Sequence, residues 1–204
     1  MKNIICLLIL VFGVVCFNAN ADEIPEKISY DGMDYVYDSS SKEFEQKVVG
    51  DINGDGKDEL IWSYRAVTDD GIAIPLCATL IYEINGDKRK LVKTITEGER
   101  PDKLYAADFD NDGTKELVVI TGSGMHWTNV IVYQYKNSDY IKIFEDGTAA
   151  SVVFEENARP LIIKVGRPKW DRQANWSYAD EPLWEVYKWD DNASKFSKEL
   201  SSSD

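Results

Sequence analysis

The sequence predicts an all-β fold, and more narrowly a small or incomplete β-propeller of about three to four four-stranded antiparallel blades. Two observations carry this prediction. A pattern of residues recurs with a period of about 50 residues, and each period contains four runs rich in Val, Ile, Tyr and Thr, separated by turns rich in Asn, Gly, Asp and Ser. No stretch shows a helical periodicity that competes with these runs.

Two recurring elements define the repeat. The acidic segment 51–60 reappears 57 positions later as residues 108–117. A strand–turn–strand element recurs three times, with Tyr82, Tyr133 and Tyr187 in equivalent places separated by 51 and 54 residues. The repeats therefore cover approximately residues 45–97, 103–146 and 149–201 of a single domain, residues 22–204.

Each repeat divides into four expected strands. They are residues 45–52, 58–67, 77–84 and 90–96 in the first repeat, 103–109, 116–122, 129–135 and 140–145 in the second, and 149–155, 161–165, 183–189 and 195–200 in the third. Three blades fall short of the four or more that usually close a ring. A hairpin within residues 28–38 would complete a fourth blade; an open arc and association with another copy are the alternatives.

Residues 1–21 have the features of a cleavable signal peptide. Lys2 is followed by an apolar run over residues 4–15 that is too short to span a membrane, and Ala19-Asn20-Ala21 precedes the expected cleavage point. We therefore expect a periplasmic or secreted protein. Lipid attachment at Cys16 is the alternative to its removal with the signal. Cleavage leaves Cys77 as the one cysteine, so no internal disulfide is expected.

The charge of the chain restricts its partners. The formal net charge is −13, from 36 acidic and 23 basic residues. Signal removal takes Lys2 away and changes the net charge to −14, because 22 basic residues then face 36 acidic ones. A charge of this sign argues against a nucleic-acid partner and favours the binding of divalent cations.

The duplicated acidic segment has the pattern of a calcium-binding loop, in which alternate residues point oxygen atoms at the ion. The sixth position of each copy is a glycine, Gly56 or Gly113, where the loop must turn sharply. Ca²⁺ is favoured over Mg²⁺ because nearly all donors are protein oxygens. The expected ligands of the two calcium sites are Asp51, Asn53, Asp55, Lys57 (carbonyl) and Glu59, and Asp108, Asp110, Asp112, Thr114 (carbonyl) and Glu116.

The third repeat carries no equivalent site, because residues 155–160 lack the alternating carboxylates and the glycine. The two acidic loops are not helical EF-hands either. They lead directly into apolar strands, and Trp62 and Val119 stand where an EF-hand has its twelfth-position glutamate.

With these features the sequence resembles the FG-GAP/VCBS-type calcium-loop β-propeller repeats, which also form the heads of integrin α-subunits. The resemblance covers roughly residues 45–200, and the two acidic loops match most closely. It implies a small exported bacterial member of this repeat class, stabilised by two calcium ions.

In an up-and-down blade, connections between the second and third strands emerge at the end opposite the acidic loops. These connections are residues 68–76, 122–128 and 167–182. Aromatic, basic and hydroxyl side chains in the last two are candidate ligand-binding residues: Ser123, His126, Trp127, Trp170, Arg172, Trp176 and Tyr178. In the alternative interpretation, Trp170 and Trp176 cap the third blade and His126 bonds a backbone carbonyl.

The leading functional hypothesis is a non-enzymatic, calcium-stabilised binding module that recognises a protein or glycan through the loops opposite the metal sites. A first alternative is a periplasmic inhibitor or immunity protein of a cell-wall-lytic enzyme, which would insert the loop 122–127 into the enzyme's cleft. A second alternative is a hydrolase of envelope polymers that uses His126. Homo-oligomerisation is compatible with each hypothesis.

Overall fold

The structure is a computed structural model that describes residues 27–124, 126–155, 158, 161–167 and 182–199. It consists of antiparallel β-sheets and one short helix, a β-propeller-like arrangement that confirms the predicted all-β class. Within the described residues, no helix is long and apolar enough to cross a membrane. The proposed signal peptide lies outside this part of the chain.

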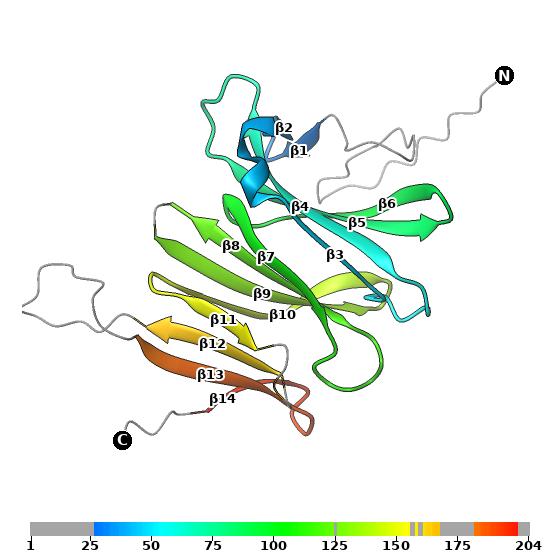
Figure 1. The fold of residues 1–204 in the computed structure, drawn as a ribbon, viewed down its shortest axis with the longest axis vertical. Coiled ribbons are helices and arrows are strands. Elements are labelled where there is room, and N and C mark those ends of the chain that lie inside the picture. Colours follow the sequence, from blue (N-terminus) through cyan, green and yellow to red (C-terminus); the bar gives the residue numbers. More distant parts are fainter. Residues whose placement is uncertain (1–26, 125, 156–157, 159–160, 168–181, 200–204) are drawn as a thin grey trace, which may run out of the picture.

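Three sheets follow one another along the chain and lie next to each other in space (Figure 1). The first contains β3 (Gln46–Gly50), β4 (Glu59–Thr68), β5 (Leu76–Asn85) and β6 (Lys88–Thr96); the second contains β7 (Arg100–Ala107), β8 (Glu116–Ser123), β9 (Trp127–Lys136) and β10 (Asp139–Thr148); the third contains β11 (Val152–Glu155), β12 (Ile162–Arg167), β13 (Leu183–Asp190) and β14 (Lys195–Glu199). Consecutive strands pair antiparallel in each sheet. The twelve strands predicted from the repeat are thus all present, with ends shifted by up to three residues.

The middle sheet is buried on both faces. Successive side chains of a strand point to opposite faces, so the apolar run of β8 divides between two cores. Leu117 and Val119 pack with residues of the first sheet, including Ile61 and Ile81. Val118 belongs to the second core, which contains residues of the third sheet. The unbroken apolar sequence of β8 is therefore explained by burial on two sides.

The N-terminal hairpin extends the first sheet. It consists of β1 (Ile28–Tyr30) and β2 (Met33–Tyr37). β3 pairs with the first half of β4, from Glu59 to Ser63, and β2 pairs with its last three residues, Ala66 to Thr68. Because β4 is twice as long as β3, the hairpin fills the part of the β4 edge that β3 leaves free. This placement differs from the fourth blade that residues 28–38 were expected to complete.

One helical element was not predicted. The 3₁₀ helix η1 (Ser39–Phe44) links β2 to β3, and Asp38 caps its first turn by accepting hydrogen bonds from the Ser40 amide and the Ser41 hydroxyl. Arg65 of β4 also bonds to the Asp38 carboxylate at 2.5 Å. The helix is therefore held by one buried acid rather than by an apolar stripe.

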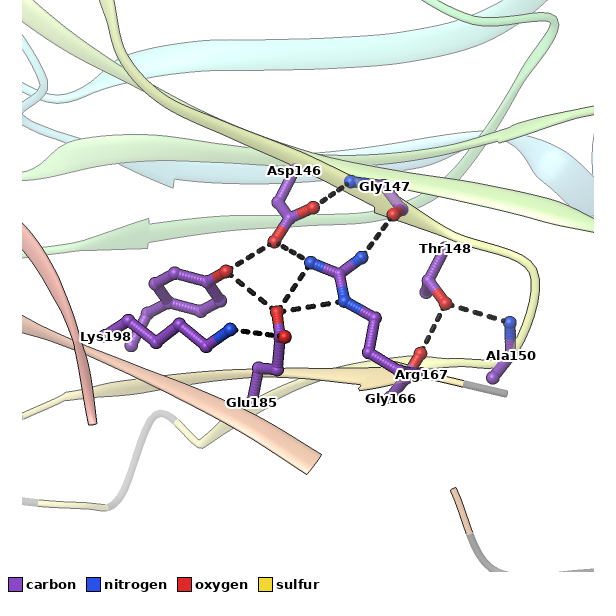
Figure 2. Close-up of polar contacts among 9 residues, drawn as sticks. Asp146, Gly147, Thr148, Ala150, Gly166, Arg167, Glu185 and Lys198 are labelled. Atoms are coloured by element: carbon purple, nitrogen blue, oxygen red, sulfur yellow. Dashed lines mark hydrogen bonds and ion pairs between the residues drawn. The ribbon is translucent and has the colours of Figure 1, made fainter. Parts of the chain in front are cut away.

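A polar cluster joins the second and third sheets at the end of β12 (Figure 2). The Arg167 guanidinium bonds to the Asp146 carboxylate and the Gly147 carbonyl of β10, both at 2.6 Å, and to Glu185 of β13 at 2.7 Å. Lys198 of β14 also contacts Glu185. Arg167 was predicted to belong to the long connection 167–182. It is instead the last residue of β12, and its guanidinium links Asp146 of the second sheet to Glu185 of the third.

This cluster makes the stability of the fold depend on pH. Burial alone would raise the pKa of Glu185, but hydrogen bonds from Arg167, Lys198 and Tyr187 outweigh it and lower the pKa to about 2 from 4.5. A lowered pKa gives stabilisation that is complete above the unfolded-state pKa and is lost as the pH falls.

We expect Glu185→Gln to lower the free energy of unfolding at pH 7 by about 1–2 kcal/mol, because charged hydrogen bonds become neutral ones at a partly exposed site. The difference from the parent protein should shrink between pH 5 and about pH 2. Urea unfolding over this pH range measures it. Glu199→Gln, which removes an exposed pair with Lys188, is the control and should cost under about 0.5 kcal/mol. If the difference in unfolding free energy did not change with pH, the lowered pKa of Glu185 would be wrong.

Candidate metal centre

The two acidic loops connect the first and second strands of the first two sheets, between β3 and β4 and between β7 and β8. Their internal hydrogen bonds are equivalent. The ninth-position glutamate accepts from the second-position amide: Glu59 from Ile52 at 3.0 Å and Glu116 from Phe109 at 2.9 Å. The first-position aspartate accepts from the glycine amide at position six, at 2.9 Å in the first loop and 3.2 Å in the second.

Two further hydrogen bonds recur. The third-position side chain accepts from the fifth-position amide, and the fifth-position side chain accepts from the seventh-position amide, in both loops. Positive φ values also recur at positions four and six, where Gly56 has φ +83° and Gly113 has φ +93°. Glycine adopts this conformation without strain. The sequence repeat is therefore a repeat of backbone conformation as well.

Each loop ends on a glutamate with only 1% of its surface exposed, Glu59 or Glu116. Burial raises the pKa of each carboxyl to about 7, and neighbouring loop carboxylates add to the rise. Burial also raises the pKa of Asp110. Concentrated and poorly solvated negative charge of this kind is what a cation in the loop would neutralise.

The second loop has the more complete donor set. Asp108, Asp110 and Glu116 each offer one carboxylate oxygen, and these oxygens lie within 4.8 Å of one another. The Oδ1 atom of Asp108 is buried without a hydrogen-bond partner. A buried, unpartnered carboxylate oxygen is costly unless something binds it. This donor set fits a hard divalent cation. Asp112 and Thr114 lie on the same loop, exposed and half-buried respectively.

The first loop is arranged differently. Asp51 accepts from the amides of Gly54 at 2.8 Å and Gly56 at 2.9 Å, so both its oxygens are engaged. The Asn53 amide donates to Glu59 at 2.8 Å. Asp55 and Lys57 are exposed. Within the described residues, no three acidic groups of this loop approach one another as they do in the second.

The two loops touch each other. The Lys115 amide donates to the Asp51 carbonyl at 3.0 Å. A Cβ atom on Gly54 would lie 2.8 Å from the Thr114 hydroxyl oxygen. The loops therefore pack together at one end of the first two sheets.

Sequence reasoning missed Gln134 of β9. Its amide nitrogen donates to Asp110 at 3.1 Å and to Glu116 at 3.2 Å, so it bridges two predicted ligands. The signal that could have found it is its place directly after Tyr133, the residue that marks the second repeat. The neighbouring strand thus contributes to the site.

The candidate recognition residues lie at the other end of the strands. Ser123 and Trp127 face each other across the β8–β9 hairpin, and His126 lies exposed in its turn. Trp127 is 48% exposed and donates a 2.7 Å hydrogen bond to Asn129. The remaining candidates, Trp170, Arg172, Trp176 and Tyr178, lie outside the described residues.

The acidic loops and the antiparallel strands that follow them define a repeat of the β-propeller type. Residues 51–119 match the family model described as an FG-GAP-like repeat, a segment that begins at the first loop and ends just after the second. The chain thus contains a segment of the FG-GAP-like repeat type. Comparison with curated proteins and with solved structures gave no match. Domains of this repeat are typically non-enzymatic binding modules.

Contact between the loops predicts unequal effects of two alanine substitutions. Gly54→Ala and Gly56→Ala both place a Cβ at positive φ, which costs about 1–2 kcal/mol. Only Gly54→Ala also meets Thr114, whereas nothing lies within 4 Å of a Cβ at Gly56. We therefore expect Gly54→Ala to cost about 1 kcal/mol more in unfolding free energy.

The control is the same pair of substitutions in a Thr114→Ala background, where the extra cost should disappear. Chemical denaturation in a chelator provides the four free energies. An excess that persists without the Thr114 hydroxyl would show that the loops are not in the contact described.

Proposed function

We propose that this chain is an exported, calcium-stabilised, non-enzymatic binding module that recognises a protein or glycan at the end opposite its metal loops. The observation that carries the metal part is the buried, unpartnered Oδ1 atom of Asp108 beside the carboxylates of Asp110 and Glu116. Export rests on the signal-like residues 1–21, which direct the protein to the periplasm or the medium.

Calcium is the cation that the loops suit best. Ca²⁺ accepts six to eight oxygen ligands in flexible geometry. In the second site, Asp108, Asp110, Asp112 and Glu116 would bind through carboxylates and Thr114 through its carbonyl. In the first, Asp51, Asn53, Asp55 and Glu59 would bind through side chains and Lys57 through its carbonyl. Gln134 would hold two carboxylates of the second site in place.

The bound ion would act as a structural clamp. Each loop joins two neighbouring strands of one sheet, and the loops contact each other between the first two sheets. An ion that binds the folded loop but not the unfolded chain stabilises the fold by mass action. The fold so stabilised is a small, three-sheet propeller arc.

Recognition at the other end is supported by the exposed side chains there. A half-exposed tryptophan at a hairpin turn supplies a large apolar surface at little entropic cost. The same exposure favours the inhibitor alternative, in which His126 and Trp127 enter the cleft of a cell-wall-lytic enzyme. A basic enzyme would also be attracted by the net charge of −14 that remains after signal removal.

We expect calcium at about 100 times its dissociation constant to stabilise the protein by about 2.7 kcal/mol for each occupied site. For a chain of this size, that corresponds to a rise in Tm of roughly 5–10 °C over the chelated protein. Thermal unfolding in calcium and in EDTA measures it, with equimolar magnesium as the control. A Tm unchanged by EDTA would remove the metal part of the proposal.

The second site should depend more on its ion, because it has four carboxylates against three in the first. Asp55→Ala and Asp112→Ala remove matching exposed ligands, so neither should disturb the core. We expect Asp112→Ala to cause the larger loss of calcium affinity in titration calorimetry. Equal losses would show that the two sites are alike.

The recognition end is tested with His126→Ala and Trp127→Ala against a panel of basic cell-wall-lytic enzymes and a glycan array. We expect at least about a tenfold loss of binding or inhibition with an unchanged Tm. Ile141→Ala, which truncates an apolar residue of β10 that is 38% exposed, is the matched control. Turnover of a cell-wall substrate that disappears with His126→Ala would instead identify a hydrolase.

A further inference from the structure

A groove opens at the recognition end, apart from the hairpin tip already discussed. It has a volume of about 870 Å³ and lies between the β1–β2 hairpin and the connection of β4 to β5, residues 69–75. Gly98 and Glu99, from the β6–β7 connection, and Ser123 of β8 complete its lining. Figure 1 shows the 69–75 connection rising beside β1 and β2.

The groove carries the most exposed apolar side chains of the described residues. Ile72 is 84% exposed and Ile74 is 71% exposed, while Tyr30 and Met33 on the facing hairpin are 49% and 40% exposed. Four of the ten large apolar residues exposed in the described part of the chain therefore line one hollow. A concentration of this kind, bordered by polar groups, marks an interaction site.

Hydrogen bonds fix the backbone of this loop. The Asp70 carboxylate accepts from the Thr68 hydroxyl at 2.7 Å and from the Ile72 amide at 3.0 Å. The Gly71 amide donates to the Thr68 carbonyl at 2.9 Å, and Gly71 has φ +66°. Ile72 is thus presented by a loop that is already ordered, which reduces the entropic cost of binding.

The border of the groove is acidic. Five carboxylates belong to its lining: Asp31, Asp34, Asp69, Asp70 and Glu99. Lys27 lies 3.7 Å from both Asp34 and Asp69, but these side chains are more than half exposed and the pairs are weak. With Lys27 counted, five negative charges and one positive charge leave −4 around the apolar centre.

We propose that this groove docks a basic protein segment that inserts apolar side chains between Ile72, Ile74 and the β1–β2 hairpin while its lysines or arginines face the acidic border. The inference rests on the proposed function, since it names the partner that the recognition end takes. Charge complementarity identifies the occupant. Nucleic acids and anionic membranes are repelled by the border, and a second copy of the 22–204 chain carries the same net charge of −14.

The test uses a fluorescent twelve-residue peptide of alternating leucine and lysine, with two matched peptides in which glutamate replaces lysine or serine replaces leucine. Anisotropy is measured with the 22–204 chain in calcium. We expect the leucine–lysine peptide to bind at least about tenfold more tightly than either matched peptide, and its affinity to fall as salt is raised. Amide shifts should concentrate in residues 28–35 and 68–76.

Ile72→Ser with Ile74→Ser should weaken peptide binding at least about tenfold, because the two side chains form the apolar centre. Asp31→Asn with Asp69→Asn should weaken it about three- to tenfold and flatten its salt dependence. Both pairs lie on exposed surface, so the Tm should not change. Val49→Ser with Val92→Ser, at exposed positions of β3 and β6, is the matched control.

Other results would overturn the inference. One is equal binding of the glutamate peptide, and another is amide shifts confined to other surfaces. A third is a dimer in sedimentation that Ile72→Ser with Ile74→Ser dissociates, because a second copy of the chain would then occupy the groove. Binding confined to the 122–127 hairpin would refute the groove but leave the proposed function standing. If the peptide binds in the groove but EDTA leaves the Tm unchanged, the groove inference stands and the calcium part of the proposed function is refuted.

Discussion

Both faces of the middle sheet are buried, and the rest of the structure depends on this double burial. Leu117, Val118, Val119 and Ile131 are at most 1% exposed, although they point to different cores. The first and third sheets are therefore fixed to β7–β10 by apolar packing. With the strands fixed, their antiparallel order places the acidic loops at one end and the β4–β5 and β8–β9 connections at the other.

The acidic groups at the two ends of the sheets lie in different environments. At one end, carboxylates are concentrated around donor positions that a cation can satisfy, with Glu59 and Glu116 buried beneath. At the other, acidic groups stand at the border of an apolar groove and remain in water. In the proposed function, the carboxylates at the first end would bind a stabilising cation and those at the second would select a basic partner.

Much of this arrangement could be predicted from the sequence, because its signals are local. Turn residues and β-branched runs set the strands, and the spacing of Asp108, Asp110 and Glu116 identified the loop whose carboxylates meet. The partners across strands could not be predicted in the same way. Gln134 joins the second loop only through the register of β8 with β9. Arg167 appeared to belong to a long loop, and only the packing of β10 against β12 shows its role.

The position of the N-terminal hairpin was also beyond local reasoning. The run Tyr35-Val36-Tyr37 is strand-like, but nothing in it indicates which edge it will join. Its place follows from unequal strand lengths, since β3 covers only half of β4. The groove could not be foreseen either, because its walls come from residues about 40 positions apart that meet only when β2 pairs with β4.

The pairing of β2 with β4 also bears on solubility. Without it, the amide and carbonyl groups of residues 66–68 would form an unpaired strand edge, and such edges can pair with strands from other molecules. The hairpin thus covers an edge that would otherwise be open to such pairing. Proteolytic loss of residues 27–36 would uncover this short edge and leave its backbone groups open to pairing with another chain.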